Sequence, residues 1–311
     1  MSEQNELRYR KILMNNGRAI PALGFGTLIP DLGDTQRATR TALEVGFRQF
    51  DCSERYRNEE AVGEAIQAVL REGRIRRDDL FIATKLWNNN HRPERVEPAF
   101  EASLARLGLK YLDLYLIHTP FAFQPGDDQD PRDQNGNLLY DHDVTSLETW
   151  RAMESLVDHG KCRAIGLSDI SLNELKTIYE SARIKPAVVQ VEAHPYLPET
   201  DLLGFCKEKG IVLLAFAPLG HGMRPGPLGD SVILAIATRV GKTPAQVLIA
   251  WAVQRGTALL TTPRSEAHAR ENFDISTLPK DALDEINRIE TRQRLNEVVN
   301  TGIPGFIPQG R

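Results

Sequence analysis

The sequence lacks the features that define several classes of protein. Its three cysteines, Cys52, Cys162 and Cys206, are an odd number without the close spacing of a metal site, which excludes a disulfide scaffold and predicts reduced thiols. No apolar run is long enough to span a bilayer, and the first residues, MSEQNELRYRK, lack the apolar segment of a secretory signal. The net charge of −4 provides no excess of basic residues for nucleic acid. We therefore expect a cytoplasmic protein with no membrane or nucleic-acid partner.

Two common cofactor motifs are missing as well. The seven histidines show no HExxH or other paired-ligand spacing, so we expect no metal site. No GxGxxG motif follows a strand-like segment near the N-terminus, where Gly24-Phe25-Gly26-Thr27 is too short to be one. This absence disfavours an open doubly wound sheet, which is the alternative fold.

What the chain does contain is an alternation of short apolar segments with amphipathic ones. Asn16-Gly17 between two apolar runs predicts an N-terminal β-hairpin. Eight continuously apolar segments follow, a pattern typical of strands that are buried on both faces of a parallel sheet. The expected strands are residues 23–26, 49–52, 80–86, 112–118, 162–168, 187–193, 211–218 and 258–263.

Segments with apolar residues at three- and four-residue spacing separate these strands, and most of them end at a glycine that can cap a helix. The expected helices are residues 35–46, 58–73, 96–108, 146–160, 171–182, 200–210 and 243–256. Eight strands in this alternation predict a (β/α)₈ TIM barrel, with residues 1–311 forming one barrel domain. Two long polar loops, residues 119–145 and 219–230, follow strands and should overhang the C-terminal rim of the barrel.

Four polar residues stand at or just beyond the ends of three expected strands: Asp51, Tyr56, Lys85 and His118. The C-termini of barrel strands converge on one rim, so these side chains are expected to share a pocket. The ammonium of Lys85 would lower the pKa of Tyr56 from about 10, and Asp51 would hold Lys85 in place. Alone, Lys85 could be a solvated strand end and Asp51 a helix cap. Together the four predict proton transfer coupled to another chemical step.

Seven ordered segments between about residues 9 and 273 carry a resemblance to a known family: GFGT, FDCSERYRNEEAVGEAI, TKLWNNNHRPERVEPAFEASLARLGLKYLDLYLIHTP, KCRAIGLSD, AVVQVEAHPYL, LLAFAPLG and TTPRSEAHARENF. In these segments the sequence resembles the aldo-keto reductases. The resemblance implies hydride transfer between a nicotinamide cofactor and the carbonyl group of an aldehyde or ketone. It also implies that Tyr56 donates the proton, that Lys85 and Asp51 support it, and that His118 holds the carbonyl oxygen.

The resemblance extends to the residues that hold the cofactor. The implied positions are Gly26, Thr27, Asp51, Ser168, Asp169, Gln190, Phe216, Pro218, Leu219, Arg264, Ser265, Arg270 and Asn272. Asp169 stands where the family commonly has Asn, and an ionised Asp can accept but not donate a hydrogen bond. Phe216 stands where the family often stacks a Tyr on the nicotinamide ring. Arg264 and Arg270 near the adenosine phosphate favour NADPH, while use of NADH is left open.

The implied substrate pocket departs from that of the well-known aldehyde-reducing members. Its expected residues are Leu28, Trp87, Thr119, Phe121 and Phe123. Leu28 and Thr119 replace aromatic residues that are common in the family, which should widen the pocket. We therefore expect bulky or hydroxylated carbonyl substrates, held in part by the C-terminal tail. The resemblance favours a monomer.

Two other functions are compatible with part of this pattern. Lys85 on a barrel strand could form a Schiff base, as in aldolase-type lyases. The chain could also be a non-catalytic cofactor-binding barrel. The cofactor-like segments in the C-terminal third argue against the lyase, and the complete set of four polar residues argues against a non-catalytic role.

Overall fold

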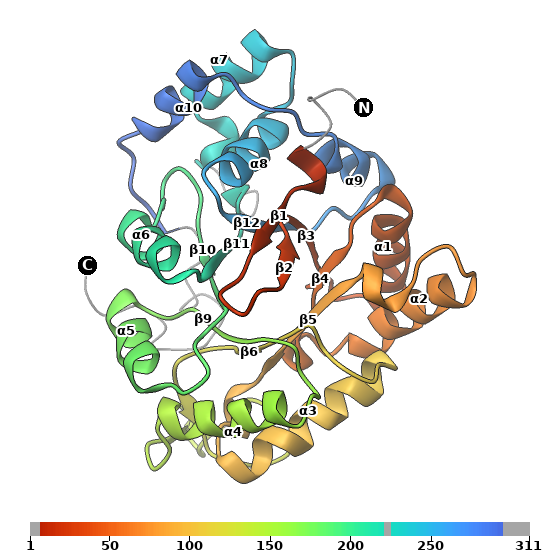
Figure 1. The fold of residues 1–311 in the computed structure, drawn as a ribbon, viewed down its shortest axis with the longest axis vertical. Helices are drawn as coiled ribbons and strands as arrows, with labels where there is room; N and C mark the ends of the chain where they lie inside the picture. The colour runs from red at the N-terminus through yellow and green to blue at the C-terminus, as the bar shows by residue number, and fades with distance from the viewer. Residues whose placement is uncertain (1–6, 221–224, 295–311) are drawn as a thin grey trace.

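The computed structural model describes residues 7–220 and 225–294, and its centre is a closed barrel of eight parallel strands (Figure 1). The strands are β3 (Leu23–Gly26), β4 (Gln49–Asp51), β5 (Phe81–Leu86), β6 (Leu114–Ile117), β9 (Ile165–Ser168), β10 (Val188–Glu192), β11 (Val212–Phe216) and β12 (Ala258–Thr261). They follow one another around the barrel in chain order, and β12 closes the ring by pairing with β3. All eight expected strands are present, so the predicted (β/α)₈ barrel is confirmed and the open sheet is wrong.

Helices surround the barrel in Figure 1. They are α1 (Leu32–Val45), α2 (Glu59–Arg71), α3 (Pro93–Leu107), α4 (Ser146–Asp158), α5 (Leu172–Ser181), α6 (Thr200–Lys209), α7 (Ser231–Val240), α8 (Pro244–Gln254), α9 (Glu266–Phe273) and α10 (Lys280–Asn287). The seven expected helices correspond to α1–α6 and α8. The sequence analysis missed α7, α9 and α10. The segment of α7, SVILAIATRV, is mostly apolar and buries Ile233, Ile236 and Ala237, a helical spacing that the sequence analysis overlooked. The helices α9 and α10 are only eight residues long and bury two or three side chains each.

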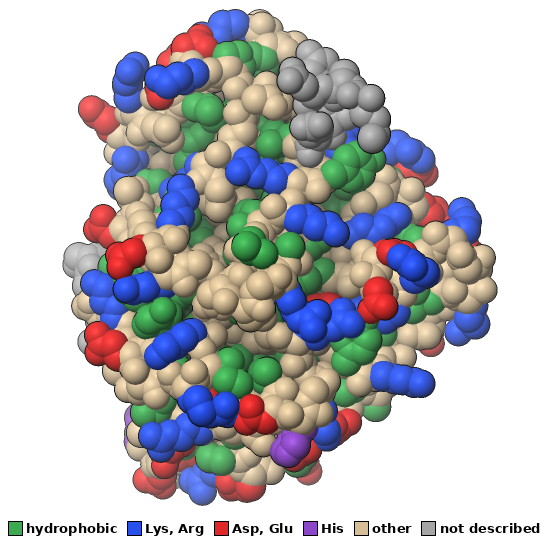
Figure 2. All heavy atoms as spheres, in the orientation of Figure 1, with side chains coloured by type: hydrophobic (Ala, Val, Ile, Leu, Met, Phe, Trp, Pro, Cys, Tyr) green, Lys and Arg blue, Asp and Glu red, His purple; other side chains and the backbone are tan. Residues whose placement is uncertain are grey.

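The predicted N-terminal hairpin is confirmed as β1 (Lys11–Leu13) paired antiparallel with β2 (Ala19–Pro21). In Figure 1 it lies over the centre of the strand ring. Ile20 and Met14 of the hairpin are buried in one cluster with the first residues of several barrel strands, including Phe81 and Leu114. The hairpin therefore plugs the N-terminal end of the barrel and leaves the opposite rim for a functional site. Figure 2 shows the hairpin end of the molecule, where charged side chains of both signs are interspersed and the hydrophobic ones form small separate groups.

The strand register brings the C-terminal ends to one rim. Gly26 pairs with Asp51 between β3 and β4, and Lys85 pairs with Leu116 between β5 and β6. Ser168 pairs with Gln190 between β9 and β10. Side chains that are far apart in the sequence are therefore neighbours at this end of the barrel.

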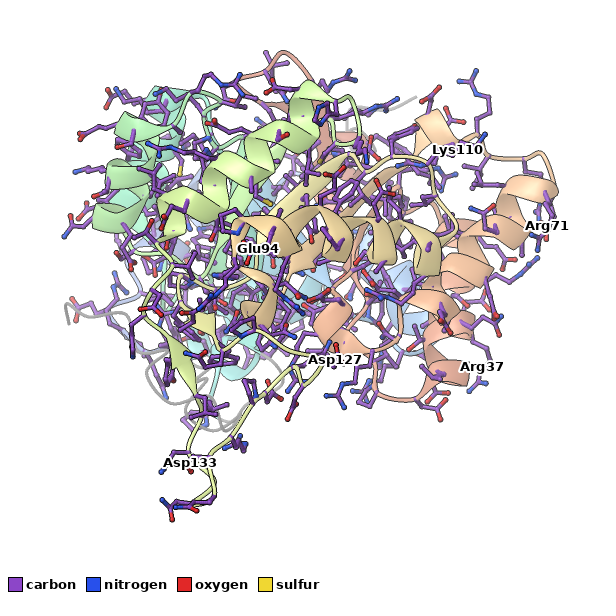
Figure 3. All side chains as sticks on the ribbon, turned by 90° about the horizontal axis from the view of Figure 1, so that it is seen from below. Arg37, Arg71, Glu94, Lys110, Asp127 and Asp133 are labelled. Atoms are coloured by element: carbon purple, nitrogen blue, oxygen red, sulfur yellow. The ribbon has the colours of Figure 1, made fainter. Side chains whose placement is uncertain are left out.

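The long loop after β6 contains a short antiparallel pair, β7 (Ala122–Phe123) and β8 (Tyr140–Asp141), which the sequence analysis did not anticipate. Phe123 packs with Trp87 and Leu138 in a small apolar cluster of its own, separate from the main core. The tip of the loop, marked by Asp133 in Figure 3, projects away from the barrel. The base of the loop is thus anchored while its tip extends outward.

No single helix in the described part of the chain is long and apolar enough to cross a membrane. The pair α7 and α8 reaches the required length and hydropathy only when taken together, and the two helices are bent by 94° at their junction.

Candidate active site

Three of the four expected polar residues form one buried hydrogen-bonded group. Lys85 lies on β5 and is fully buried, Asp51 ends β4, and Tyr56 ends the short 3₁₀ turn η3 (Glu54–Tyr56). The Nζ atom of Lys85 donates to Asp51 Oδ2 at 2.6 Å, to the carbonyl of Cys52 at 2.9 Å and to Tyr56 Oη at 3.2 Å. These three bonds use all three donors of an ammonium group. Because Tyr56 Oη accepts from Lys85, its own hydrogen is available to another acceptor.

Burial raises the pKa of Tyr56, and the nearby ammonium of Lys85 lowers it by less, so the pKa lies above its ordinary value. The expected lowering of this pKa by Lys85 is therefore present, but burial, which a sequence does not show, outweighs it. Burial also lowers the pKa of Lys85, but Asp51 and Tyr56 raise it by more, and the net pKa is raised. Lys85 is consequently an ammonium and Tyr56 a protonated phenol, which is the state that a proton donor requires.

His118 follows β6, and its ring lies edge-on to two aromatic rings. The ring centroids are 5.9 Å from Tyr56 and 4.9 Å from Trp87. Burial lowers the pKa of His118 well below its ordinary value, with a further contribution from Lys85, so the imidazole is neutral. A neutral imidazole carries its hydrogen on only one of its two nitrogens, and the neighbouring groups decide which.

Ser53 contacts the ring of His118, and the sequence analysis did not identify it. Its Oγ lies 3.0 Å from His118 Nδ1 and accepts a hydrogen bond from the backbone N–H of Arg55 at 3.1 Å. With the serine hydrogen directed to His118 Nδ1, that nitrogen is an acceptor. On this basis we assign the imidazole hydrogen to Nε2. Ser53 was visible in the segment DCSERY, but nothing in the sequence brings it to a residue 65 positions away.

Replacing Ser53 by Ala should shift the tautomer of His118. Removal of one hydrogen bond of about 1 kcal/mol corresponds to a change of roughly fivefold in the ratio of the Nε2–H to the Nδ1–H form. Nitrogen chemical shifts of the histidine ring measure this ratio. Ser155→Ala is the control, because Ser155 lies 3.4 Å from Nδ1 of the exposed His159 on α4 and should leave the His118 signals unchanged. Identical His118 shifts in the wild type and Ser53→Ala would contradict the assignment.

A second group of polar residues lies beside the first, with Asp169 just after β9 and Gln190 in the middle of β10. The N–H of Asp169 donates to the carbonyl of Gln190 at 2.8 Å, and Gln190 Nε2 donates to Asp51 Oδ1 at 2.8 Å. Asp169 has a left-handed backbone with φ of 54°, and its Oδ1 is buried without a hydrogen-bond partner in the described residues. The carboxyl of Asp169 is thus a buried polar group available to a ligand, next to the residues that hold Lys85.

Burial raises the pKa of Asp169 well above its ordinary value; Arg294 lowers it and Glu192 raises it further. A raised pKa favours the neutral carboxyl, which can donate a hydrogen bond as well as accept one, over the ionised form, which can only accept. The sequence could show the replacement of Asn by Asp but not the burial that changes its protonation.

The other expected cofactor positions lie on neighbouring strands. Gly26 ends β3 and Thr27 follows it, while Phe216 ends β11 and Pro218 and Leu219 are in the turn after it. With β9, β10 and β12, these strands form one continuous arc of the barrel, and β4, β5 and β6 with the four catalytic candidates complete the ring. A Cβ atom at Gly26 would meet Thr262 Oγ1 at 2.8 Å, so glycine keeps the chain open there.

The expected residues for the adenosine end of the cofactor differ in their exposure and in their partners. Arg264 is exposed, and no ion pair engages it among the described residues. Ser265 caps α9 by accepting from the N–H of His268 at 3.2 Å. Arg270 is paired with Glu266 on the same helix at 2.6 Å, and Asn272 is buried. Arg264 and the N-terminus of α9 therefore offer the positive charge that is free for a phosphate.

The expected substrate residues fall into two groups. Leu28, which is 51% exposed, and the partly buried Phe121 are accessible at the rim. Trp87 and Phe123 are buried against each other with centroids 6.1 Å apart, and the hydroxyl of Thr119 donates to Asn88 Oδ1 at 2.6 Å. Phe123 and Thr119 therefore support the wall of the site from behind. The C-terminal tail, residues 295–311, lies outside the described residues, as do residues 221–224 of the loop after β11.

Within residues 7–220 and 225–294, no group of three or more His, Cys, Asp or Glu side chains is arranged to hold a metal ion.

Comparisons with known proteins agree with this arrangement. The sequence model of the Aldo/keto reductase family matches residues 22–291. Aldo-keto reductase family 1 member A1 of Bos taurus is 39% identical over 290 residues, which cover 89% of either chain. Prostaglandin F synthase 1 of Bos taurus is 40% identical over 297 residues, which cover 90% of this chain and 92% of that protein. The solved structure of the aldose reductase from Schistosoma japonicum superposes with a TM-score of 0.89 at 38% identity, covering 96% of this chain and 98% of its own.

Proposed function

We propose a specific reaction for this chain, which belongs to the aldo/keto reductase family of nicotinamide-dependent oxidoreductases that act on carbonyl compounds. In this proposal it transfers hydride between NADPH and a bulky or hydroxylated aldehyde or ketone, and Tyr56 is the proton donor. The observation that carries the proposal is the buried ammonium of Lys85, which donates to Asp51, to the Cys52 carbonyl and to Tyr56 Oη. This arrangement leaves the phenolic hydrogen of Tyr56 free for a substrate oxygen.

When bound, the reduced nicotinamide supplies a hydride to the carbonyl carbon. The substrate oxygen becomes more basic as that bond forms, and Tyr56 transfers its proton to it. The Nε2–H of His118 donates a second hydrogen bond to the same oxygen, so that developing negative charge meets two fixed donors. Lys85 stabilises the negative charge left on Tyr56, and Asp51 keeps Lys85 oriented.

Asp169 after β9 and Gln190 on β10 fit the carboxamide of a nicotinamide. A carboxamide needs both an acceptor and a donor, and the neutral carboxyl of Asp169 can serve as either. Gln190 uses its Nε2 on Asp51, which leaves Oε1 to accept from the amide. Phe216 provides an apolar ring at the end of β11 for stacking. We assign the 2′-phosphate of NADPH to Arg264 and the N-terminal N–H groups of α9.

The substrate proposal depends on two side chains that are smaller than the aromatic residues common at their positions. Leu28 is exposed at the rim, and Thr119 is buried with its hydroxyl bonded to Asn88. The smaller side chains favour a substrate larger than a flat aromatic aldehyde.

A titration with NADPH and NADH, followed by rapid mixing of the complex with a panel of carbonyl compounds, tests the proposal. We expect NADPH to bind roughly tenfold or more tightly than NADH, because a charge-assisted phosphate contact contributes about 1.5–3 kcal/mol. We expect kcat/KM for bulky hydroxylated ketones to exceed that for small aromatic aldehydes. Arg264→Ala should weaken NADPH binding alone, and Arg71→Ala, at the exposed end of α2, should weaken neither cofactor.

Equal affinity for both cofactors, unaffected by Arg264→Ala, would contradict the NADPH assignment. Much faster reduction of small aromatic aldehydes than of bulky ketones would contradict the proposed substrate class. Absence of cofactor-dependent turnover across the whole panel would contradict the proposed reaction.

A further inference from the structure

The loop after β6 reaches back to the turn that carries Tyr56, through a single glutamine and its neighbour. Gln129 Nε2 donates to the carbonyl of Glu54 at 3.1 Å, and Gln129 Oε1 accepts from Arg57 Nε at 2.8 Å. The carbonyl of Gln129 accepts from Trp87 Nε1 at 2.7 Å. The next residue, Asp130, accepts from Arg55 Nη2 at 2.5 Å. Three of these bonds join the loop to the segment that carries Tyr56, and the fourth joins it to Trp87.

The turn η3 needs such support because it is only three residues long. Its internal hydrogen bonds run from the N–H of Tyr56 to the carbonyl of Ser53 and from the N–H of Arg57 to the carbonyl of Glu54, at 3.1 Å each. Arg57 adopts a left-handed backbone with φ of 55°, which is unfavourable for a residue with a side chain. A single 3₁₀ turn is not stable by itself in water. Its position must therefore come from contacts with the rest of the protein.

The turn is held in part by the buried side chain of Glu54, which accepts from the N–H of Trp87 at 3.0 Å and from Asn90 Nδ2 at 2.9 Å. It also borders an open space. A cleft of about 820 Å³ lies between α2, α3 and the loop after β6, and Glu54, Arg57, Asn90 and Gln129 are among its lining residues. Two further lining residues, Glu94 and Asp127, are labelled in Figure 3. With open space beside the turn, hydrogen bonds to Gln129 take the place of side-chain packing.

We propose that Gln129 is a positioning residue for the proton donor: its side chain fixes the Glu54–Arg57 segment so that Tyr56 Oη stays against Lys85, while its carbonyl orients Trp87. This inference rests on the proposed function, because it takes Tyr56 as the donor. The contact between Lys85 and Tyr56 is 3.2 Å long, at the outer limit of a hydrogen bond. A small displacement of the turn would break it, and a misplacement of about 1 Å can reduce a rate about a hundredfold.

The loop itself does not need the side chain of Gln129 to keep its shape. Its strands β7 and β8 pair with each other, and Arg92 forms two hydrogen bonds with Asp141, at 2.7 and 3.3 Å. Asn89 and Arg95 both donate to the carbonyl of Gly126, at 2.8 and 2.9 Å. Truncation of Gln129 should therefore release the tyrosine turn without unfolding the loop.

The test combines a measurement of mobility with a measurement of rate on Gln129→Ala. Hydrogen exchange of the backbone amides of Tyr56 and Arg57 should become faster by at least about tenfold, as expected for a segment that opens locally. kcat for carbonyl reduction should fall by roughly 10- to 100-fold, while the Kd for NADPH, measured by fluorescence, stays within about twofold. Gln129→Glu keeps the acceptor for Arg57 and should recover part of both losses.

Asn137→Ala is the matched control in the same loop. Its side chain donates to Asp133 at the projecting tip, at 3.0 Å, and forms no other hydrogen bond among the described residues, so exchange at Tyr56 and kcat should both match the wild type. Unchanged exchange in Gln129→Ala, or a kcat within about twofold of the wild type, would overturn the positioning role. A wild type without any cofactor-dependent turnover would instead overturn the proposed function, and the exchange comparison would still decide whether Gln129 fixes the turn.

Discussion

Replacement of Tyr56 by Phe should lower kcat for carbonyl reduction by roughly 10²- to 10⁴-fold, the range that positioned general acids contribute, and leave the Kd for NADPH within about twofold. Lys85 donates to Tyr56 Oη, so the phenolic hydrogen points away from the ammonium and is free for the substrate. Phenylalanine keeps the ring beside His118 and removes only the hydroxyl. Steady-state kinetics with NADPH and a reducible ketone, together with fluorescence titration of the cofactor, measure the two quantities.

Tyr115→Phe provides a matched control for this substitution. Tyr115 is fully buried on β6, and its hydroxyl has no hydrogen-bond partner in the described residues, so its removal should leave kcat unchanged. If Tyr56→Phe kept more than a tenth of the wild-type kcat, another group would have to be the proton donor. Parallel losses of activity in both variants would indicate a general effect of removing a buried hydroxyl.

The barrel could be predicted from the sequence because all of its strands have to be buried on both faces. Each is therefore mostly apolar, with the polar residues concentrated toward the C-terminal rim, and a helix or turn signal separates it from the next. The missed elements lack such a signal. The pair β7 and β8 has two residues in each strand, and its apolar partners Trp87 and Leu138 come from segments that no local pattern connects.

The convergence of Asp51, Tyr56, Lys85 and His118 was also predictable, because the ends of parallel strands meet at one rim. The residues that were missed act through loops. Ser53 and Gln129 each contact a partner more than 60 positions away, and only the path of the loop brings them there. The raised pKa values of Tyr56 and Asp169 were missed for a different reason. Burial is the largest cause of both increases, and the depth at which a rim residue is buried cannot be read from the sequence.

The state of Lys85 bears on the alternative of a Schiff-base lyase. A lysine that attacks a carbonyl must be a neutral amine with a free lone pair. Burial lowers the pKa of Lys85, but Asp51 and Tyr56 raise it by a larger amount. All three ammonium hydrogens also form hydrogen bonds. Lys85 is therefore held as a cation near neutral pH, and family membership agrees with an oxidoreductase.

Lys85→Met should be the most destabilising of the substitutions considered. Methionine leaves the carboxylate of Asp51 buried without its cation, and breaking a buried ion pair in this way costs about 3–5 kcal/mol of unfolding free energy. kcat should fall by roughly 10²-fold as well, because the charge that stabilises ionised Tyr56 is gone. Denaturant unfolding gives the first quantity and steady-state kinetics the second. Lys280→Met is the control, since the Lys280 side chain is 90% exposed and should affect neither.

Two further comparisons separate the charge of Lys85 from its volume. In Lys85→Met combined with Asp51→Asn, no buried carboxylate lacks a partner, so part of the lost unfolding free energy should return.

The pKa of Lys85 is raised in the folded protein, so its stabilising contribution is complete below the unfolded value of about 10.4 and is lost as pH rises through the folded value. The stability gap between the wild type and Lys85→Met should therefore be constant from pH 7 to about 10 and narrow only at higher pH. A gap that already narrowed near pH 8 would show that Lys85 is not held as a cation by Asp51 and Tyr56, and the proposed support for the proton donor would fail with it.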